Sequence, residues 1–560
     1  MFIRVKPSGP RKYLQIVKSI WDKGTVRQKV IGTLGRLDKL KESGELDGLL
    51  RSGVRFSEKL AIIDSYEKGH VPSTEDVRVG IPIIFDRLWK ELGIRPVIEE
   101  LLGDRKYRFP VERAIFLTVL HRLSVSGSDR AAEKWKEHYK IPGADGIDLH
   151  HLYRAMAWLG EELPEEDQRG ATPFAPRCIK DLIEEGIFQR NRDLFRDLTL
   201  VFFDTTSIYF EGNGGDELGA FGHSKDHRPD LKQMVVGVII DGHGRPICCE
   251  LWPGNTADVK TLTPVMERLR NRFGIQRVCI VADRGMISKE TIKEIEGTKG
   301  IQYILGVRMR RQKEVKEEVI GRAGRYEEVY PKGTHSKSPS PLKVKEVIVN
   351  DRRYIICLNK DQAKKDAFDR EAIVAALKDK IKRSEKTLIG NKGYRKYLKL
   401  SGPRFQIDED KIKEESRYDG KWVLTTNTDL SSQEVALQYK QLWMVEQIFR
   451  SLKTILSTRP IYHKCDETIR GHVFCSFLSL LLIKELQGRM DQKGWQVEWA
   501  DLMNDLEEVK EIRIQTDNKE VFLRSELRGN AGKAFQAAGA AIPPTVRVIG
   551  MDDKDAVKLR

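Results

Sequence analysis

"DLTLVFFDTTSIYF" (residues 197–210) is an apolar run of β-branched and aromatic residues that is interrupted by an acid, Asp204. A run of this composition belongs in a β-sheet and is buried on one or both faces. We therefore predict a strand that ends at Asp204. A carboxylate in that place either begins a turn or is a chemical group held in a fixed position. Taken alone, the stretch favours the turn.

The segments after residue 198 follow strand and helix patterns in turn. The predicted strands are "LTLVFFD" (198–204), "LKQMVVGVIID" (231–241), "RPICCELWPGN" (245–255), "QRVCIVADRGM" (276–286) and "IQYILGVR" (301–308), and the predicted helices are "DVKTLTPVMERLRNRF" (258–273) and "SKETIKEIE" (288–296). Three consecutive strands followed by strand–helix units predict an α/β fold with a mixed sheet of the ribonuclease H kind. The strand pattern of 276–286 also ends at an acid, Asp283.

A third acid lies in "SSQEVALQYKQLWMVEQIFRSLKTIL" (431–456), which predicts one long helix with a capping box at its start. Seven residues make roughly two helical turns, so Tyr439, Glu446 and Lys453 fall on one stripe. Arg450 follows Glu446 by four residues and lies on the same side. The alternative interpretation is an amphipathic helix with a solvated ion pair between Glu446 and Arg450.

Three carboxylates, Asp204, Asp283 and Glu446, are therefore predicted to meet at one end of the sheet. Such a cluster repels itself unless cations fill it, and hard oxygen ligands suit Mg²⁺ or Mn²⁺. Two ions about 4 Å apart activate a water or a 3′-hydroxyl and stabilise the leaving oxygen of a phosphodiester. The sequence thus predicts a site for two divalent ions.

The chain has 560 residues, a net charge of +15 and a pI of about 9.2, which is typical of a protein that binds a polyanion. Its seven scattered cysteines and the absence of an apolar leader favour a reducing compartment and exclude a disulfide scaffold. We divide the chain into a small β/α region (1–75), a helical DNA-binding region (76–195), a catalytic core in two parts (196–308 and 421–495), a basic β-rich insertion (309–420) and a C-terminal region that is a candidate for dimerisation (496–560). A helical packing domain explains 76–195 equally well.

Three motifs of the sequence resemble those of a known protein family. "FFDTTS" (202–207) and "ADRGMIS" (282–288) are similar to the first-acid and second-acid motifs of the DDE transposases of prokaryotic insertion sequences, in the superfamily named for insertion sequence four. The third-acid signature of that family is Tyr-x2-Arg-x3-Glu-x6-Lys. Tyr439, Glu446 and Lys453 match it, whereas Leu442 stands at the Arg position.

The stretch 222–261, "GHSKDHRPDLKQMVVGVIIDGHGRPICCELWPGNTADVKT", resembles the subgroup named for insertion sequence 1634. The resemblance implies cut-and-paste transposition of double-stranded DNA, in which the protein binds the terminal inverted repeats, exposes 3′-hydroxyls and joins them to target DNA. It also implies that Asp204, Asp283 and Glu446 hold two Mg²⁺ or Mn²⁺ ions. It further implies a homodimer at the paired DNA ends in the prokaryotic cytoplasm, near the nucleoid and without a membrane.

Several side chains are candidates for DNA contacts: Tyr439, Lys453, Arg450 in place of the missing Arg, Arg284 after the second acid, and Lys225 and Arg228 in the basic loop after the first. For that loop, a solvated turn is the alternative. Two other functions stay open for the whole chain. One is a catalytically silent DNA-binding relic or domesticated protein, and the other is a metal-dependent nuclease of the same fold.

Overall fold

The structure is a computed structural model, and it describes residues 2–22, 25–54, 74–169, 171, 175–191, 199–275, 277–286, 288–330, 342–383, 396–401, 404–515 and 519–550. The strands are β1 (Phe2–Ser8), β2 (Arg11–Asp22), β3 (Thr25–Arg36), β4 (Thr74–Arg78), β5 (Leu200–Tyr209), β6 (Gln233–Asp241), β7 (Pro246–Pro253), β8 (Val278–Ala282), β9 (Ile301–Gly306), β10 (Glu327–Glu328), β11 (Leu342–Val349), β12 (Arg352–Asn359), β13 (Leu398–Ser401), β14 (Arg404–Ile407), β15 (Lys421–Thr426), β16 (Lys510–Gln515), β17 (Lys519–Arg524) and β18 (Val546–Gly550).

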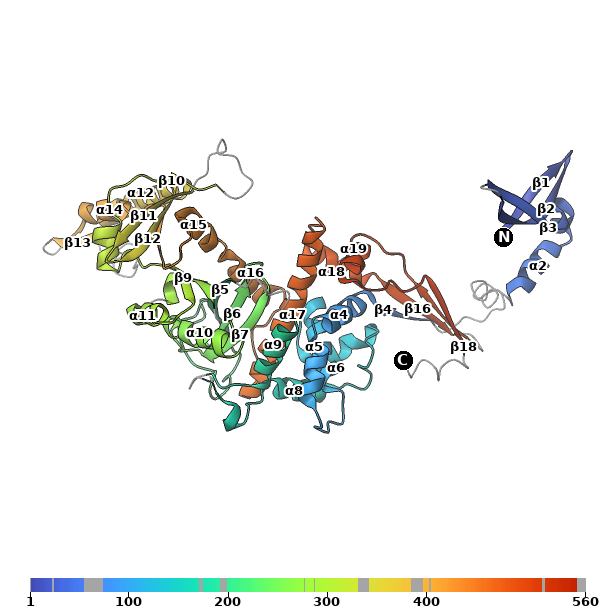
Figure 1. The fold of residues 1–560 in the computed structure, drawn as a ribbon, viewed down its shortest axis with the longest axis horizontal. Helices are drawn as coiled ribbons and strands as arrows, with labels where there is room; N and C mark the ends of the chain where they lie inside the picture. The colour runs from blue at the N-terminus through green and yellow to red at the C-terminus, as the bar shows by residue number, and fades with distance from the viewer. Residues whose placement is uncertain are drawn as a thin grey trace.

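The α-helices are α1 (Leu37–Glu42), α2 (Glu45–Val54), α4 (Gly80–Glu91), α5 (Ile94–Leu102), α6 (Val111–Ser124), α7 (Asp129–Trp135), α8 (Leu149–Leu159), α9 (Ile179–Arg190), α10 (Leu262–Asn271), α11 (Lys289–Gly297), α12 (Lys360–Arg383), α14 (Glu409–Ser416), α15 (Ser432–Lys440), α16 (Trp443–Thr454), α17 (Asp466–Gln492), α18 (Trp499–Glu507) and α19 (Ala531–Ala538). Two short 3₁₀ turns, η5 (Asp258–Lys260) and η6 (Arg284–Met286), contact each other, and η6 lies within the second-acid motif. Figure 1 shows the large sheet, the helices around α17 and the sheet of β1–β3 in succession along the long axis.

A nine-stranded sheet, ordered β10-β11-β12-β15-β9-β8-β5-β6-β7, forms the centre of the fold. β5, β8 and β9 are parallel neighbours, and the other pairs are antiparallel. Along the chain, β5 to β9 with α10 and α11 follow the order that the sequence predicts. The predicted α/β fold with a large mixed sheet is therefore confirmed.

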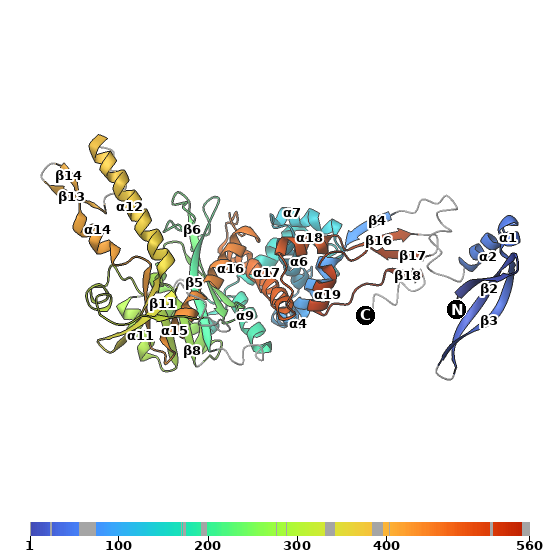
Figure 2. The same cartoon turned by 90° about the horizontal axis from the view of Figure 1, so that it is seen from above.

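The basic segment 309–420 contributes to the same sheet. β12 pairs with β15 over six residue positions, and β11 and β10 extend the sheet beyond it. The segment then continues into the long helix α12, the hairpin of β13 and β14, and α14. Figure 2 shows α12 and this hairpin projecting from that end of the sheet.

The helices of the middle region pack around α17, whose apolar side chains are buried. α6 is buried along its whole length from Val111 to Leu123. A helix that is buried on every side packs the core and has no face left for a ligand. A second sheet, ordered β18-β17-β16-β4, joins the start of this region to the C-terminal segment.

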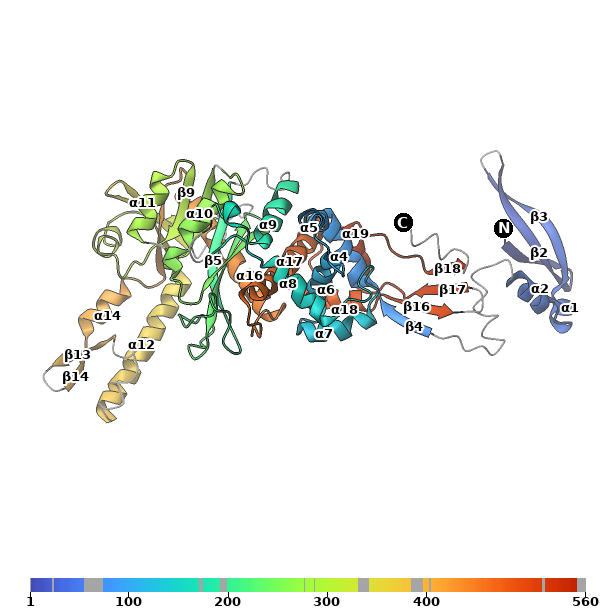
Figure 3. The ribbon, with the colours of Figure 1, turned by 90° about the horizontal axis from the view of Figure 1, so that it is seen from below.

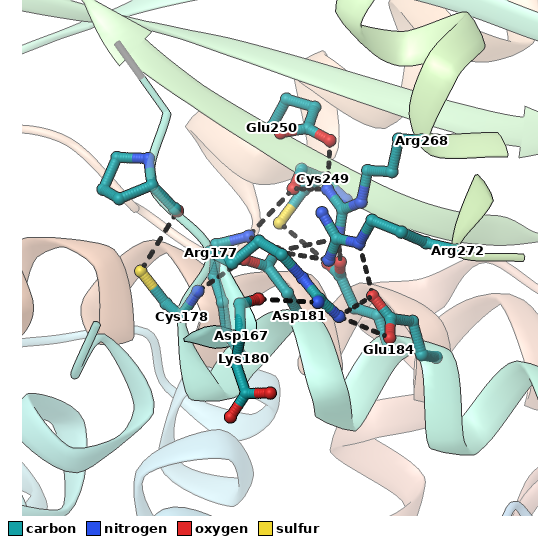
Figure 4. A network of polar contacts seen from close by, with 12 residues as sticks. Asp167, Arg177, Cys178, Lys180, Asp181, Glu184, Cys249, Glu250, Arg268 and Arg272 are labelled. Carbon is teal, nitrogen blue, oxygen red and sulfur yellow. Dashed lines mark hydrogen bonds and ion pairs between the residues drawn. The ribbon is translucent and has the colours of Figure 1, made fainter. Parts of the chain in front are cut away.

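A buried network of charges joins the helical region to the large sheet (Figure 4). Arg268 on α10 donates hydrogen bonds to Glu184, to Glu250 and, at 2.8 Å, to Asp181. Lys180 donates to Asp181 at 2.6 Å and to the Cys249 carbonyl at 3.1 Å. Every charge in this group therefore has an opposite charge in contact, which offsets the cost of burial.

None of the helices in the described part of the chain combines the length and the hydropathy that a membrane span requires.

Candidate active site

The first two acids lie side by side because of the register between two parallel strands. β5 pairs with β8 up to Phe203 opposite Ala282. The next residues on the two strands are Asp204 and Asp283, and neighbouring strands lie about 4.8 Å apart. The two carboxylates therefore leave the sheet at adjacent positions, where β8 ends.

The strand that carries Asp204 does not end there, and the prediction of a strand end is wrong. β5 continues to Tyr209, and its second half pairs with β6 from Asp204 opposite Val238 to Tyr209 opposite Gln233. The β-branched residues after Asp204 suit a strand better than a turn, and they are buried. At Asp204 the strand loses only its β8 neighbour.

Both acids open onto a cleft of about 510 Å³ that Glu446 also lines. The other lining residues are Arg284, Gly306, Val307, Met309, Trp422, Val423, Tyr439, Lys440, Leu442 and Trp443. Asp204 and Asp283 are partly buried, whereas Glu446 is exposed. The cleft therefore brings the three predicted acids together with two basic side chains, Arg284 and Lys440.

The segment that carries the third acid consists of two helices, α15 and α16, and the predicted single helix over 431–456 is wrong in this respect. At the junction, the backbone bonds span three residues: Leu442 donates to the Tyr439 carbonyl at 3.1 Å and Val445 to the Leu442 carbonyl at 3.0 Å. Such turns are tighter than those of an α-helix. The stripe from Tyr439 to Glu446 therefore does not follow regular helical spacing, although both residues line the cleft.

Tyr439 holds the second acid in place. Its hydroxyl donates a hydrogen bond to the Asp283 carboxylate at 3.0 Å. Burial and the neighbouring Asp283 raise the pKa of Tyr439, so the hydroxyl keeps its proton and remains a donor. Gly306 permits this contact, because a Cβ at that position would lie 2.4 Å from the Tyr439 hydroxyl oxygen.

The first acid lies in an environment that disfavours its charge. Burial raises the pKa of Asp204 to about 6, and the nearby carboxylates of Asp283 and Asp258 raise it as well. Lys225 and the Thr205 N–H, which donates to Asp204 at 2.7 Å, oppose the shift. A partly desolvated carboxylate among other acids gains from a cation that binds beside it.

Lys225 and Asp258 brace the strand next to Asp204. The Lys225 ammonium donates to the Thr205 carbonyl at 2.7 Å and to the Thr205 hydroxyl at 2.9 Å. That hydroxyl donates to Asp258 at 2.8 Å, and Lys225 lies 3.4 Å from the same carboxylate. This arrangement fixes the backbone one residue beyond the first acid.

Comparison with protein families gives two matches. The model described as "Transposase DDE domain" matches residues 196–482, which is just over half of the chain, and the model described as "IS1634 family transposase, N-terminal domain" matches residues 3–65. The chain belongs to the DDE transposase family of the IS1634 group. The resemblance inferred from the three motifs is thereby confirmed.

Among solved structures, the chain is similar to one titled "Mos1 transposase paired-end complex with left transposon end", with 15% sequence identity and a TM-score of 0.13. The matched region covers 36% of this chain and 61% of that chain, which is less than two thirds of its length. The comparison with curated proteins found no match.

The predicted DNA-contact residues of this family member lie in different surroundings. Arg284 lines the cleft, and Arg450 is exposed on α16. Arg228 pairs with Asp230 at 2.9 Å on the surface. Lys453 donates to Asp226 at 2.8 Å and is only 12% exposed.

This chain has Leu442 at the position where the third-acid signature of the family has Arg. Its side chain is buried and lines the cleft. Among the ion pairs of the described residues, none joins Glu446 to Arg450. The solvated Glu446–Arg450 pair that we considered as an alternative is therefore not formed.

Two residues close to the acids, Asp258 and Gly306, are not among the predicted site residues. Asp258 lies in "GNTADVKT" (254–261), a polar segment between a strand and a helix, within the stretch that resembles the subgroup. Gly306 ends β9, where a glycine in a strand signals the close approach of another group. That signal was present in the sequence.

The donor set fits Mg²⁺ or Mn²⁺, because the cleft presents three carboxylates and, among the described residues that line it, no cysteine thiolate and no imidazole. The carboxylate oxygens of Asp204, Asp283 and Glu446 do not all lie within 4.8 Å of one another. The ligand atoms of a separate cluster, Asp129, His463 and His472, do lie within that distance. The guanidinium of Arg122 already neutralises the cluster, since it lies 2.9 Å from the His472 Nδ1 and 3.7 Å from the Asp129 carboxylate.

Proposed function

We propose that the chain is a DNA transposase. It binds the terminal inverted repeats of its insertion sequence, cleaves phosphodiester bonds at the element ends and transfers the 3′-hydroxyl ends to target DNA. The observation that carries the proposal is the register that places Asp204 beside Asp283, with Glu446 in the same cleft. In this proposal the nine-stranded sheet is a ribonuclease H-like core, and 309–420 is an insertion between the second and third acids.

In the proposed mechanism, Asp204, Asp283 and Glu446 hold two Mg²⁺ or Mn²⁺ ions. When bound there, such ions would supply Lewis-acid stabilisation of charge on the phosphate oxygens. Tyr439 orients the Asp283 carboxylate through its hydrogen bond. Arg284 and Lys440 give the cleft wall a positive charge that suits a DNA backbone.

Pairing two DNA ends requires two active sites, so we propose a homodimer in the complex with the element ends.

A cleavage and joining assay tests the proposed function. Labelled DNA from both flanks of the gene is incubated with the protein, Mg²⁺ or Mn²⁺, and a target plasmid. We expect metal-dependent nicks that leave 3′-hydroxyls at the repeat boundary, followed by joined products. Asp283→Asn is expected to lose both, whereas Asp501→Asn, the same change at an exposed acid of α18, should behave as the wild type.

Two other outcomes identify the alternatives. Binding to the flanks without cleavage in either metal would indicate a DNA-binding relic, and cleavage without joining would indicate a nuclease of the same fold.

The contact of Tyr439 with Asp283 gives a second prediction. Gly306→Ala places a methyl group against the Tyr439 hydroxyl, so we expect the cleavage rate to fall by about 10²-fold, the loss that a displacement of about 1 Å can cause. Tyr439→Phe removes the hydrogen bond without a steric clash and should cost about tenfold. Gly297→Ala, where a Cβ meets open space, is the matched control.

The double variant separates the two effects. If Gly306 acts through Tyr439, the alanine costs much less in the Tyr439→Phe background than in the wild type. Additive losses would contradict the role assigned to the glycine.

A further inference from the structure

We propose that the hairpin of β2 and β3 binds double-stranded DNA by entering a groove. The proposal rests on the proposed function, because it names the surface that recognises the element DNA. It moves the principal DNA contact from the helical region, where the sequence analysis put it, to the N-terminal sheet.

The charge of this sheet is the first observation. Residues 1–36 contain nine Lys and Arg and a single acid, Asp22. Lys18 and Lys29 are direct partners on the paired strands, and both are exposed. Like charges that face each other across two strands destabilise a sheet. A polyanion that binds both side chains removes this repulsion, so the pair suits a phosphate backbone.

The shape of the hairpin is the second observation. β1 pairs with β2 only from Arg11 to Val17, while β2 and β3 pair up to Asp22 opposite Thr25. The last five residues of β2 and their partners therefore form a two-stranded ribbon, about 17 Å long at about 3.4 Å per residue. The major groove of B-DNA is about 12 Å wide and admits such a ribbon. Figure 3 shows the hairpin projecting away from α1 and α2.

The third observation is an apolar pair near the end of the ribbon. Trp21 and Val26 are cross-strand partners, and their exposed fractions are 76% and 59%. An exposed indole is unfavourable in water, yet it suits contact with base edges or insertion at a base step. Lysines at phosphates and an aromatic group at the bases are the two halves of groove recognition.

A second copy of the chain is the other occupant to consider for this exposed face. Self-association would bring together two sheets that each have a large excess of positive charge, which opposes close contact. DNA complements the same charge. The observations therefore favour DNA over a second copy.

The test uses the full chain and a labelled duplex that carries the terminal repeat, with an unrelated duplex of equal length. In Lys18→Gln/Lys29→Gln we expect affinity for both duplexes to fall at least about tenfold at moderate salt. The slope of log K against log[salt] should become shallower by about 1.8, the value for two lost phosphate contacts. Lys39→Gln/Lys41→Gln makes the same charge change on exposed residues of α1 and should leave both quantities unchanged.

Trp21→Ala tests the apolar contact. We expect it to weaken binding to the terminal repeat by about tenfold and to change binding to the unrelated duplex by less than about twofold. Wild-type affinity and salt slope in both hairpin variants would overturn the proposal, and so would loss of a dimer in Trp21→Ala with DNA affinity intact. Because binding needs no metal and no cleavage, this result is independent of whether the protein proves to be a transposase.

Circular dichroism and melting of each variant show whether the sheet is intact. The lysine variant removes a repulsion, so its melting temperature should not fall.

Discussion

Asp204→Asn is expected to abolish DNA cleavage and, at the same time, to make the metal-free protein more stable. The variant keeps the shape of the side chain and its hydrogen-bonding oxygen but removes the charge. We expect the loss of cleavage to exceed about 10³-fold, since a metal-bound acid supports several kcal/mol of transition-state stabilisation. The gain in stability has a separate cause.

That cause is the cost of a charge in a partly buried, acidic environment. The pKa of Asp204 is raised from 3.8 to about 6, so the charged form is less favourable in the folded protein than in the unfolded chain. A shift of this size corresponds to about 3 kcal/mol at neutral pH. For a carboxylate with a raised pKa, the penalty is present above the folded pKa and vanishes as the pH falls below the unfolded one. The stabilisation by Asn should therefore be full above about pH 6 and lost near pH 4.

Thermal unfolding with and without divalent ions measures both parts. In the absence of metal at about pH 7.5, which is above the raised pKa of Asp204, the variant should melt at a higher temperature than the wild type. Added Mg²⁺ or Mn²⁺ should raise the melting temperature of the wild type and of Asp501→Asn much more than that of Asp204→Asn. An equal response of all three proteins would show that Asp204 is not a metal ligand.

The positions of the first two acids were predictable because local sequence determines them. A buried parallel strand is a continuous apolar run, so its end is visible where the run meets an acid, here Asp283. The parallel direction of β8 and β9 then follows from the strand–helix–strand connection between them. Asp204 illustrates the limit of this logic, since β5 continues past it through pairing with β6, a partner some thirty residues away.

The geometry around the third acid was not predictable in the same way. Residues 441–442 are Gln and Leu, which favour a helix, yet the chain tightens there between α15 and α16. Tertiary packing overrides local propensity at this junction. Contacts such as Tyr439 to Asp283 and Lys453 to Asp226 join segments that are 156 and 227 residues apart, and no periodicity indicates them.

The same distinction applies to the buried charges. Arg268 lies on a helix whose sequence pattern gives no reason to bury an arginine, and its partners come from α9 and β7. Its place in the network follows only from the packing of three elements. Its role is structural, and it leads to the second large effect that we expect.

Arg268→Met is expected to destabilise the junction of α9, α10 and β7 by about 3–5 kcal/mol, because it leaves Glu184 and Glu250 buried without their main partner. Burial already raises the pKa of Glu184, and Arg268 is the largest influence that lowers it. Without Arg268 this carboxyl should bind a proton more readily. A carboxyl whose pKa is raised by folding costs stability at pH values above that pKa. The destabilisation caused by Arg268→Met should therefore be greater at about pH 8 than at about pH 5.

Hydrogen exchange of peptides from α9 and α10, followed through urea, reports this junction rather than the whole chain. Arg270→Met makes the same change two residues away on α10 and should cost less than about 1 kcal/mol. Arg268→Met/Glu184→Gln should recover part of the loss, because it removes one of the uncompensated charges. Two results would contradict this role of the charges. One is that Arg268→Met destabilises the junction no more than Arg270→Met does, and the other is that adding Glu184→Gln to Arg268→Met lowers the stability further.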